Sequence, residues 1–215
     1  MVRAVSAYPF VVTHPDLSEL SRHPFAPVIA LPSNYEVYDF TRGYDPNRTL
    51  QTPYGIGRYN ERRLGMYESE LFSPGTSDVR NIHLGIDLGA PVGTKIHAFY
   101  DGIVYLVGIN PAPGDYGGTL ITEHHVGELV LWALHGHLSH GSIADRRPGQ
   151  SVRMGEVIAR IGDRHENGGW NPHLHFQLSL RRPERCDLPG TASQRDIDAA
   201  LAIYPDPRLV LGPLY

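Results

Sequence analysis

The sequence predicts a mainly β fold whose strands are mostly antiparallel. Between residues 80 and 181, short segments rich in Ile, Val and Leu alternate with turns rich in Gly, Pro and Asp. No segment with helical periodicity separates these strands, so parallel crossover units are not expected. Hydrophobic residues make up 41% of the 215 residues and charged residues 20%, which is enough to build a packed core. The length suits one domain with an extension.

The first segment, residues 1–79, is expected to be an irregular arm that packs on the domain. Seven prolines lie before residue 55, and proline disfavours long helices and central strands. One helical turn is expected near Asp16–Leu20, and a short helix is possible at Asn60–Leu64.

The second segment, residues 80–185, holds the expected strands of the domain. They are residues 81–88, 94–100, 102–108, 118–124, 128–137, 156–161 and 173–181.

The third segment, residues 186–215, is expected to form a short helix and a tail. Ser193 and Asp196 fit a capping box, and apolar residues follow at helical spacing. The helix must end near Pro205.

Three stretches of the β segment place polar side chains two or four residues apart within aliphatic sequence. The pairs are His83 and Asp87, His135 and His137, and His173 and His175. Because successive side chains of a strand point to opposite faces, each pair is expected to share one face, with the aliphatic residues on the other. Together the three pairs favour one shared metal site.

The donor types in these stretches suit zinc. Imidazole and carboxylate ligands without thiolate are typical of Zn²⁺, and the single cysteine, Cys186, excludes a multi-cysteine site and an internal disulfide. Two histidines and one carboxylate leave a fourth position open for water, as in catalytic zinc sites. Further histidines nearby could act as a general base or stabilise an oxyanion.

The segment before the last histidine pair has two interpretations. Glu166–Trp170 is either a glycine turn with a packed indole, or a loop over a cleft in which Asn167 and Trp170 contact substrate.

These motifs resemble, in their order, those of the lysostaphin/LytM-type zinc metallopeptidases. The resemblance rests on His83-x-x-x-Asp87, His137-Leu138 and His173-x-His175, with matching connecting segments across residues 80–180. The stretch Asn167–Gln177 also looks like a subgroup fused to aminotransferase and kinase-like domains. That hints at a small-molecule or cytoplasmic role.

The resemblance implies a residue assignment and an activity. His83, Asp87 and His175 would bind zinc, and His137 and His173 would be the catalytic pair beside the attacking water. The implied fold is a mainly antiparallel, two-sheet β structure, similar to a barrel-sandwich hybrid, with the cleft across one sheet. The implied reaction is hydrolysis of a peptide or amide bond in peptidoglycan or a small peptide.

One departure from the family concerns substrate contact. The family usually has tyrosine two residues before the His137 position, where this chain has His135. An imidazole there can contact substrate, bind metal or titrate instead of donating as a phenol does.

Two other functions fit parts of the pattern. A non-catalytic zinc-binding or regulatory module would close the fourth position with a residue of the arm, for which Asn34 is a conceivable donor. A cupin-like metal dioxygenase also uses H-x-H in a β fold, but it needs a glutamate that Gln177 replaces here.

Composition limits the partners. The net charge is −4, so a nucleic-acid binder is not expected. No stretch has the roughly 20 apolar residues of a membrane span. Without a visible signal segment the sequence predicts a cytoplasmic protein, or an extracytoplasmic one if the chain has been trimmed. The expected partner is a peptide or peptidoglycan-derived substrate, and no oligomeric state is predicted.

Overall fold

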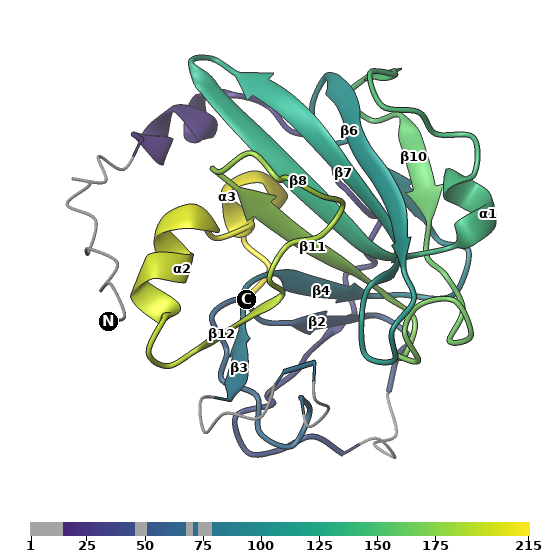
Figure 1. Ribbon diagram of the computed structural model, residues 1–215, viewed down its shortest axis with the longest axis vertical. Helices are drawn as coiled ribbons and strands as arrows, with labels where there is room; N and C mark the ends of the chain where they lie inside the picture. The colour runs from purple at the N-terminus through teal and green to yellow at the C-terminus, as the bar shows by residue number, and fades with distance from the viewer. Residues whose placement is uncertain (1–14, 46–50, 68–70, 73–78) are drawn as a thin grey trace, which may run out of the picture.

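The computed structural model describes residues 15–45, 51–67, 71–72 and 79–215, and its largest element is an eight-stranded sheet (Figure 1). The strand order is β1-β2-β4-β11-β8-β7-β6-β9. All neighbours in it are antiparallel except β1 and β2. The predicted mainly β, mostly antiparallel fold is confirmed. The strands of this sheet are β1 (Glu36–Val37), β2 (Gly55–Gly57), β4 (Ile86–Gly89), β6 (Gly102–Asn110), β7 (Gly117–Val126), β8 (Leu129–Leu138), β9 (Ser151–Val152) and β11 (His173–Ser179).

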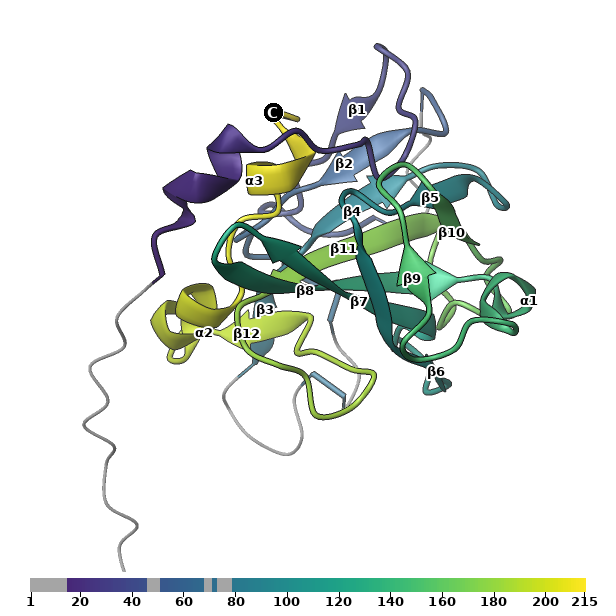
Figure 2. The ribbon, with the colours of Figure 1, turned by 90° about the horizontal axis from the view of Figure 1, so that it is seen from above.

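Two short sheets cover the two faces of the large one (Figure 2). One consists of β5 (Lys95–His97) and β10 (Val157–Arg160), the other of β3 (Arg80–His83) and β12 (Thr191–Ser193). Residues of β5 and β10 pack in the cluster that holds Phe176, whereas residues of β3 and β12 pack in the cluster that holds Leu134. The core therefore has two layers, one on each face of the sheet.

The expected strand 81–88 is divided into two, which corrects the prediction of one continuous strand. Its first half is β3, which pairs with β12, and its second half is β4, which pairs with β2 and β11. Between them the Leu84 N–H donates to the Gly190 carbonyl at 2.9 Å. The split arises because each half finds its partner in a different sheet.

The arm contributes the edge of the large sheet. A 3-10 helix, η1 (Leu17–Arg22), lies at the expected turn, and the Asp16 carboxylate accepts from the Ser18 N–H at its start. β2 then pairs with β4. The short helix expected at Asn60–Leu64 is wrong. Arg62 forms a bridge to Ile82, and the Arg63 N–H donates to the Asn81 carbonyl, so this stretch runs extended beside β3.

The C-terminal segment returns to the arm. α2 (Ile197–Ile203) ends before Pro205, as predicted, and the Ser193 hydroxyl contacts both the N–H and the carboxylate of Asp196. The remaining helices are α1 (His140–Ile143) and α3 (Arg208–Leu211). Within the described ranges, none of the helices has the length and apolarity needed to cross a bilayer.

Candidate active site

Three side chains from three strands converge on one point. His83 ends β3, Asp87 lies on β4, and His175 lies on β11 directly opposite Asp87 in the ladder. His83 Nε2 is 3.2 Å from Asp87 Oδ1 and 3.1 Å from His175 Nδ1, and His175 Nδ1 is 3.1 Å from Asp87 Oδ1. Ligand atoms about 2.0–2.1 Å from a tetrahedral zinc would lie roughly 3.3 Å apart. The donor set and its spacing therefore fit zinc.

Each imidazole of this triangle is oriented by a hydrogen bond on its outer side. His83 Nδ1 lies 2.9 Å from both the Arg58 carbonyl oxygen and Arg63 Nη2, and His175 Nε2 lies 3.0 Å from Gln177 Oε1. Gln177 is itself fixed, because its Nε2 donates to the Pro189 carbonyl. The tautomers that donate outward leave a lone pair on each inner nitrogen. Both histidines are thus set up to act as ligands.

Asp87 is the negative charge of the site. Its Oδ1 faces the histidines, and its Oδ2 accepts from Arg63 Nη1 at 2.7 Å. Burial opposes ionisation of Asp87, but the interactions of the carboxyl with the His83 ring and the Arg63 guanidinium outweigh burial and hold its pKa well below its ordinary value. Burial lowers the pKa of His83 to about 4. A neutral imidazole and an ionised carboxylate are the forms that bind a metal.

A second pair of histidines lies beside the triangle. The rings of His137 and His173 have centroids 4.2 Å apart, and His173 Nε2 is 3.6 Å from Asp87 Oδ1. His137 Nδ1 lies 2.9 Å from the Asn167 carbonyl oxygen, and His173 Nδ1 lies 2.6 Å from that of Asn171. Donation from both Nδ1 atoms leaves both Nε2 atoms as acceptors. Burial lowers the pKa of both imidazoles, which favours this neutral form.

His135 does not share the face of His137, which corrects the expected alternation. The register of β8 against β7 shifts between His135 and Leu138, and His137 has a φ of 65°. This irregularity turns His137 into the cleft. His135 stays opposite Phe176 in the core, with ring centroids 5.3 Å apart and Nδ1 3.3 Å from the Leu120 carbonyl oxygen. The expected contact of His135 with substrate is therefore wrong.

The segment that carries most of these site residues matches a known family. Residues 81–187 match the model of peptidase family M23. The chain carries a domain of peptidase family M23. The resemblance to lysostaphin/LytM-type metallopeptidases is confirmed, and the cupin-like alternative is not supported.

Relatives of the M23 domain include two bacterial proteins named as DD-peptidases. It is 38% identical over 99 residues to the DD-carboxypeptidase/endopeptidase Mpg of Neisseria meningitidis serogroup B, covering 46% of this chain and 20% of that protein. It is 28% identical over 105 residues to the peptidoglycan DD-endopeptidase ShyA of Vibrio cholerae, with the same two coverages. The aligned region is therefore about a fifth of the length of these relatives.

Among solved structures, the chain is similar to the catalytic domain of the antimicrobial peptidase lysostaphin from Staphylococcus simulans. It is 20% identical to this chain with a TM-score of 0.44, and the alignment covers 68% of this chain and 92% of that one.

In the loop before β11 of the M23 domain, Trp170 faces the cleft and the side chain of Asn167 does not. Trp170 lines the cleft, 6.5 Å from the His137 ring and 6.1 Å from the Tyr67 ring, as centroids. The expected contact of Asn167 with substrate is wrong, because its side chain is buried within the loop. Asn167 Nδ2 donates to the Trp170 carbonyl, and Oδ1 accepts from the Gly169 N–H. Asn167 therefore positions Trp170 and, through its carbonyl, His137.

The cleft of the M23 domain holds about 550 Å³ and is bounded on one side by the arm. Arm residues that line it include several aromatic side chains, namely Tyr38, Phe40, Tyr44, Tyr67 and Phe72. Asn34 is exposed and is not among the lining residues, so the fourth ligand conceived for it is not supported.

Two site residues have no signal in the sequence. Arg63 reaches Asp87 from the arm, and Tyr116 lies between β6 and β7 with its ring centroid 5.1 Å from that of His175. The Tyr116 hydroxyl donates to the Leu188 carbonyl. A phenol thus reaches the cleft from position 116, although position 135 lacks one. Neither contact follows from a local pattern, because each joins segments distant in sequence.

Proposed function

We propose that this chain is a zinc-dependent peptidase that hydrolyses a peptide or amide bond, with zinc held by His83, Asp87 and His175. The observation that carries the proposal is the triangle of donor atoms with edges of 3.1–3.2 Å, whose two imidazoles are held by outward hydrogen bonds. The family to which the domain belongs supports the reaction class.

The second histidine pair supplies the proton chemistry. Bound zinc would provide a water of lowered pKa and polarise the scissile carbonyl. His137 and His173 line the cleft with Nε2 free, so either imidazole would accept the proton of the attacking water, and the imidazolium formed would then donate from Nε2 to the developing oxyanion. The carbonyls of Asn167 and Asn171 accept from Nδ1 of these rings, which keeps both rings in the tautomer whose Nε2 can accept a proton.

The proposed substrate is a peptide of the peptidoglycan type or a small peptide. Two relatives named as DD-peptidases support this choice. The cleft, at about 550 Å³, has the size of a site for a few residues of peptide, and its aromatic arm side offers apolar contact. The proposed zinc site uses no residue of the arm, which argues against a closed regulatory site among the described residues.

Metal content tests the ligand assignment. The purified protein is expected to bind one zinc ion, and His83→Ala and Asp87→Ala are expected to lose it, because each removes one of three donors. The measurement is elemental analysis after dialysis, with His165→Ala, an exposed histidine, as the control. Full zinc occupancy in both site variants would remove the assignment.

Turnover with metal retained tests the catalytic pair. His137→Ala is expected to keep zinc while its hydrolysis of muropeptides or a peptide library falls 100-fold or more, the usual size of a general acid–base contribution. Loss of metal from this variant would instead make His137 a ligand and overturn the division of roles.

A further inference from the structure

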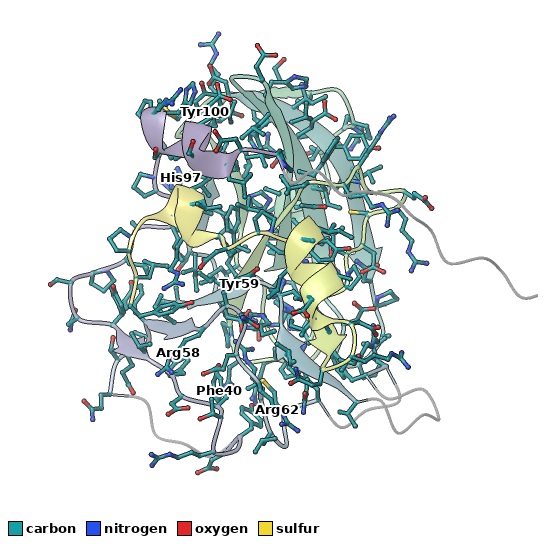
Figure 3. The ribbon with its side chains drawn as sticks, turned by 90° about the vertical axis from the view of Figure 1, so that its left-hand side faces the viewer. Phe40, Arg58, Tyr59, Arg62, His97 and Tyr100 are labelled. Carbon is teal, nitrogen blue, oxygen red and sulfur yellow. The ribbon has the colours of Figure 1, made fainter. Side chains whose placement is uncertain are left out.

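The side chain of an arginine from the arm, Arg63, is buried against the proposed zinc site. Arg63 is 2% exposed and lies outside residues 81–187, the part of the chain that matches the family. It belongs to the extended stretch beside β3, and the neighbouring Arg58 and Arg62 lie with Phe40 on the face seen in Figure 3. A buried arginine needs partners for its charge and for its N–H groups.

The guanidinium of Arg63 has partners on every side. Nε donates to Glu61 Oε2 at 3.3 Å, and Nη1 donates to the Tyr67 hydroxyl at 2.8 Å and to Asp87 Oδ2 at 2.7 Å. Nη2 lies 2.9 Å from His83 Nδ1 and 3.4 Å from the Arg58 carbonyl oxygen. The Phe40 ring packs over the guanidinium carbon, 5.1 Å from its centroid. These contacts fix both the position and the plane of the group.

The sheet leaves room for this contact by means of a glycine. Gly57 of β2 lies opposite Asp87 of β4, and a Cβ at position 57 would lie 2.7 Å from Arg63 Nη2 and 2.9 Å from Asp87 Oδ2. Any larger side chain would therefore separate the guanidinium from the carboxylate. Strand β2 and Arg63, both from the arm, therefore enclose the Asp87 carboxylate together.

The two oxygens of Asp87 have different environments. Oδ1 faces His83 Nε2 and His175 Nδ1, whereas Oδ2 is held by Arg63. We propose that Arg63 is a positioning residue that restricts Asp87 to bind zinc through Oδ1 alone. This inference rests on the proposed zinc peptidase function.

The restriction matters for the open position of the metal. A carboxylate that binds through both oxygens adds one more donor atom, which would raise the coordination number from four to five and crowd the position that a hydrolytic water needs. The hydrogen bond from Arg63 occupies Oδ2 and leaves one oxygen for the metal. An ammonium group at this position would keep a charge but could not also reach Tyr67 and Arg58 in the same plane.

Two measurements test the role of Arg63. The first is a crystal structure of the zinc-loaded wild-type protein, which is expected to show Asp87 Oδ1 on the metal and Oδ2 on Arg63 Nη1. The second is the visible spectrum of the Co²⁺-loaded protein, whose absorption is strong for four ligands and weaker for five. Arg63→Gln is expected to lose absorption and turnover number while KM is retained, because Asp87 then binds through both oxygens.

The matched control is Arg62→Gln, which removes the same charge from the adjacent exposed residue and is expected to keep the wild-type spectrum. Bidentate Asp87 in the wild-type crystal structure would overturn the inference even if Arg63→Gln did not fold. A folded Arg63→Gln protein with an unchanged cobalt spectrum would do the same. If the wild-type protein bound no metal, the proposed function itself would fail.

Discussion

At the scale of single residues, Gly85, which lies between His83 and Asp87 in the chain, allows the His175 strand to come close to these two residues. A Cβ at position 85 would lie 2.6 Å from His175 Cε1 and Nε2 and 2.9 Å from the Phe176 carbonyl oxygen. The first contact is with a proposed ligand, and the second is with the backbone of a central strand, which cannot move easily. Only glycine lets β11 and the connection between β3 and β4 approach this closely.

Gly85→Ala is therefore expected to damage the site and the fold together. The added methyl group must displace the His175 ring or β11, which costs about 1–3 kcal/mol of unfolding free energy and weakens zinc binding. Urea unfolding and competition with a chromophoric zinc chelator measure the two effects.

The matched control is Gly141→Ala in α1, where a Cβ meets only Ser139 Oγ at 3.9 Å. This control is expected to leave zinc affinity unchanged and to keep or slightly raise the free energy of unfolding, because alanine is favoured over glycine in a helix. Wild-type zinc affinity in Gly85→Ala would contradict the close approach at His175.

At the scale of elements, the arm is tied to the end of the chain rather than to the cleft alone. The Tyr59 hydroxyl donates to the Tyr204 carbonyl at 2.6 Å, and the Tyr35 hydroxyl donates to the Leu214 carbonyl at 3.0 Å. A third hydrogen bond joins the two segments, since the Tyr59 N–H donates to the Tyr215 hydroxyl at 2.9 Å. The C-terminal segment thus holds the arm segment that carries Arg63.

Tyr59→Phe tests this anchoring. The variant keeps the ring but leaves the Tyr204 carbonyl without its donor, so the free energy of unfolding is expected to fall by about 1 kcal/mol. Equilibrium urea unfolding measures it, and Tyr44→Phe, which contacts Phe40 through its ring, is the control. Equal stability of wild type and Tyr59→Phe would show that this bond adds nothing.

The sequence predicted the long strands well because their pattern is local. Residues 102–108, 118–124, 128–137 and 173–181 alternate over many positions, and each range coincides with a strand to within two residues at either end. β1, β2 and β12 have only two or three residues each and exist because a partner strand holds them. No local pattern could reveal them.

The candidate site was also predicted in part from local sequence patterns. The motifs place His83, Asp87 and His175 together, and the structure brings them within hydrogen-bond distance. The error at His135 came from extending strict alternation through a register shift, which the sequence does not mark. Arg63 was missed because its role depends on an arm that returns to β4 through long-range pairing. Such roles depend on contacts between segments distant in sequence, and the periodicity of a sequence does not predict those contacts.

At the scale of the whole molecule, several histidines are buried without a positive charge. Burial lowers the pKa of His124 to about 4 and that of His135 to about 3. Both lie in the core outside the proposed zinc triangle, and His135 Nε2 has no hydrogen-bond partner among the described residues. In the unfolded chain such imidazoles titrate near pH 6.5. Protonation therefore favours unfolding over a wide pH range.

The direction of the effect follows from proton binding. Between about pH 6 and pH 4 the unfolded chain holds a proton on these imidazoles and the folded chain does not, so the free energy of unfolding falls as the pH falls. Each such histidine contributes a slope of about 1.4 kcal/mol per pH unit in that range. The contribution of these neutral histidines to the free energy of unfolding is fully present above about pH 6.5 and decreases progressively as the pH falls below that value.

His135→Leu isolates one of these contributions. Leucine removes the titrating group from an apolar site beside Phe176, so the slope of unfolding free energy against pH is expected to fall by about 1.4 kcal/mol per pH unit between pH 6 and pH 4. Urea unfolding of the chelator-treated protein at several pH values measures it, with His165→Leu as the exposed control expected to keep the wild-type slope. A His135→Leu slope equal to that of wild type would mean that the folded chain already protonates His135, and that the core at this position admits charge.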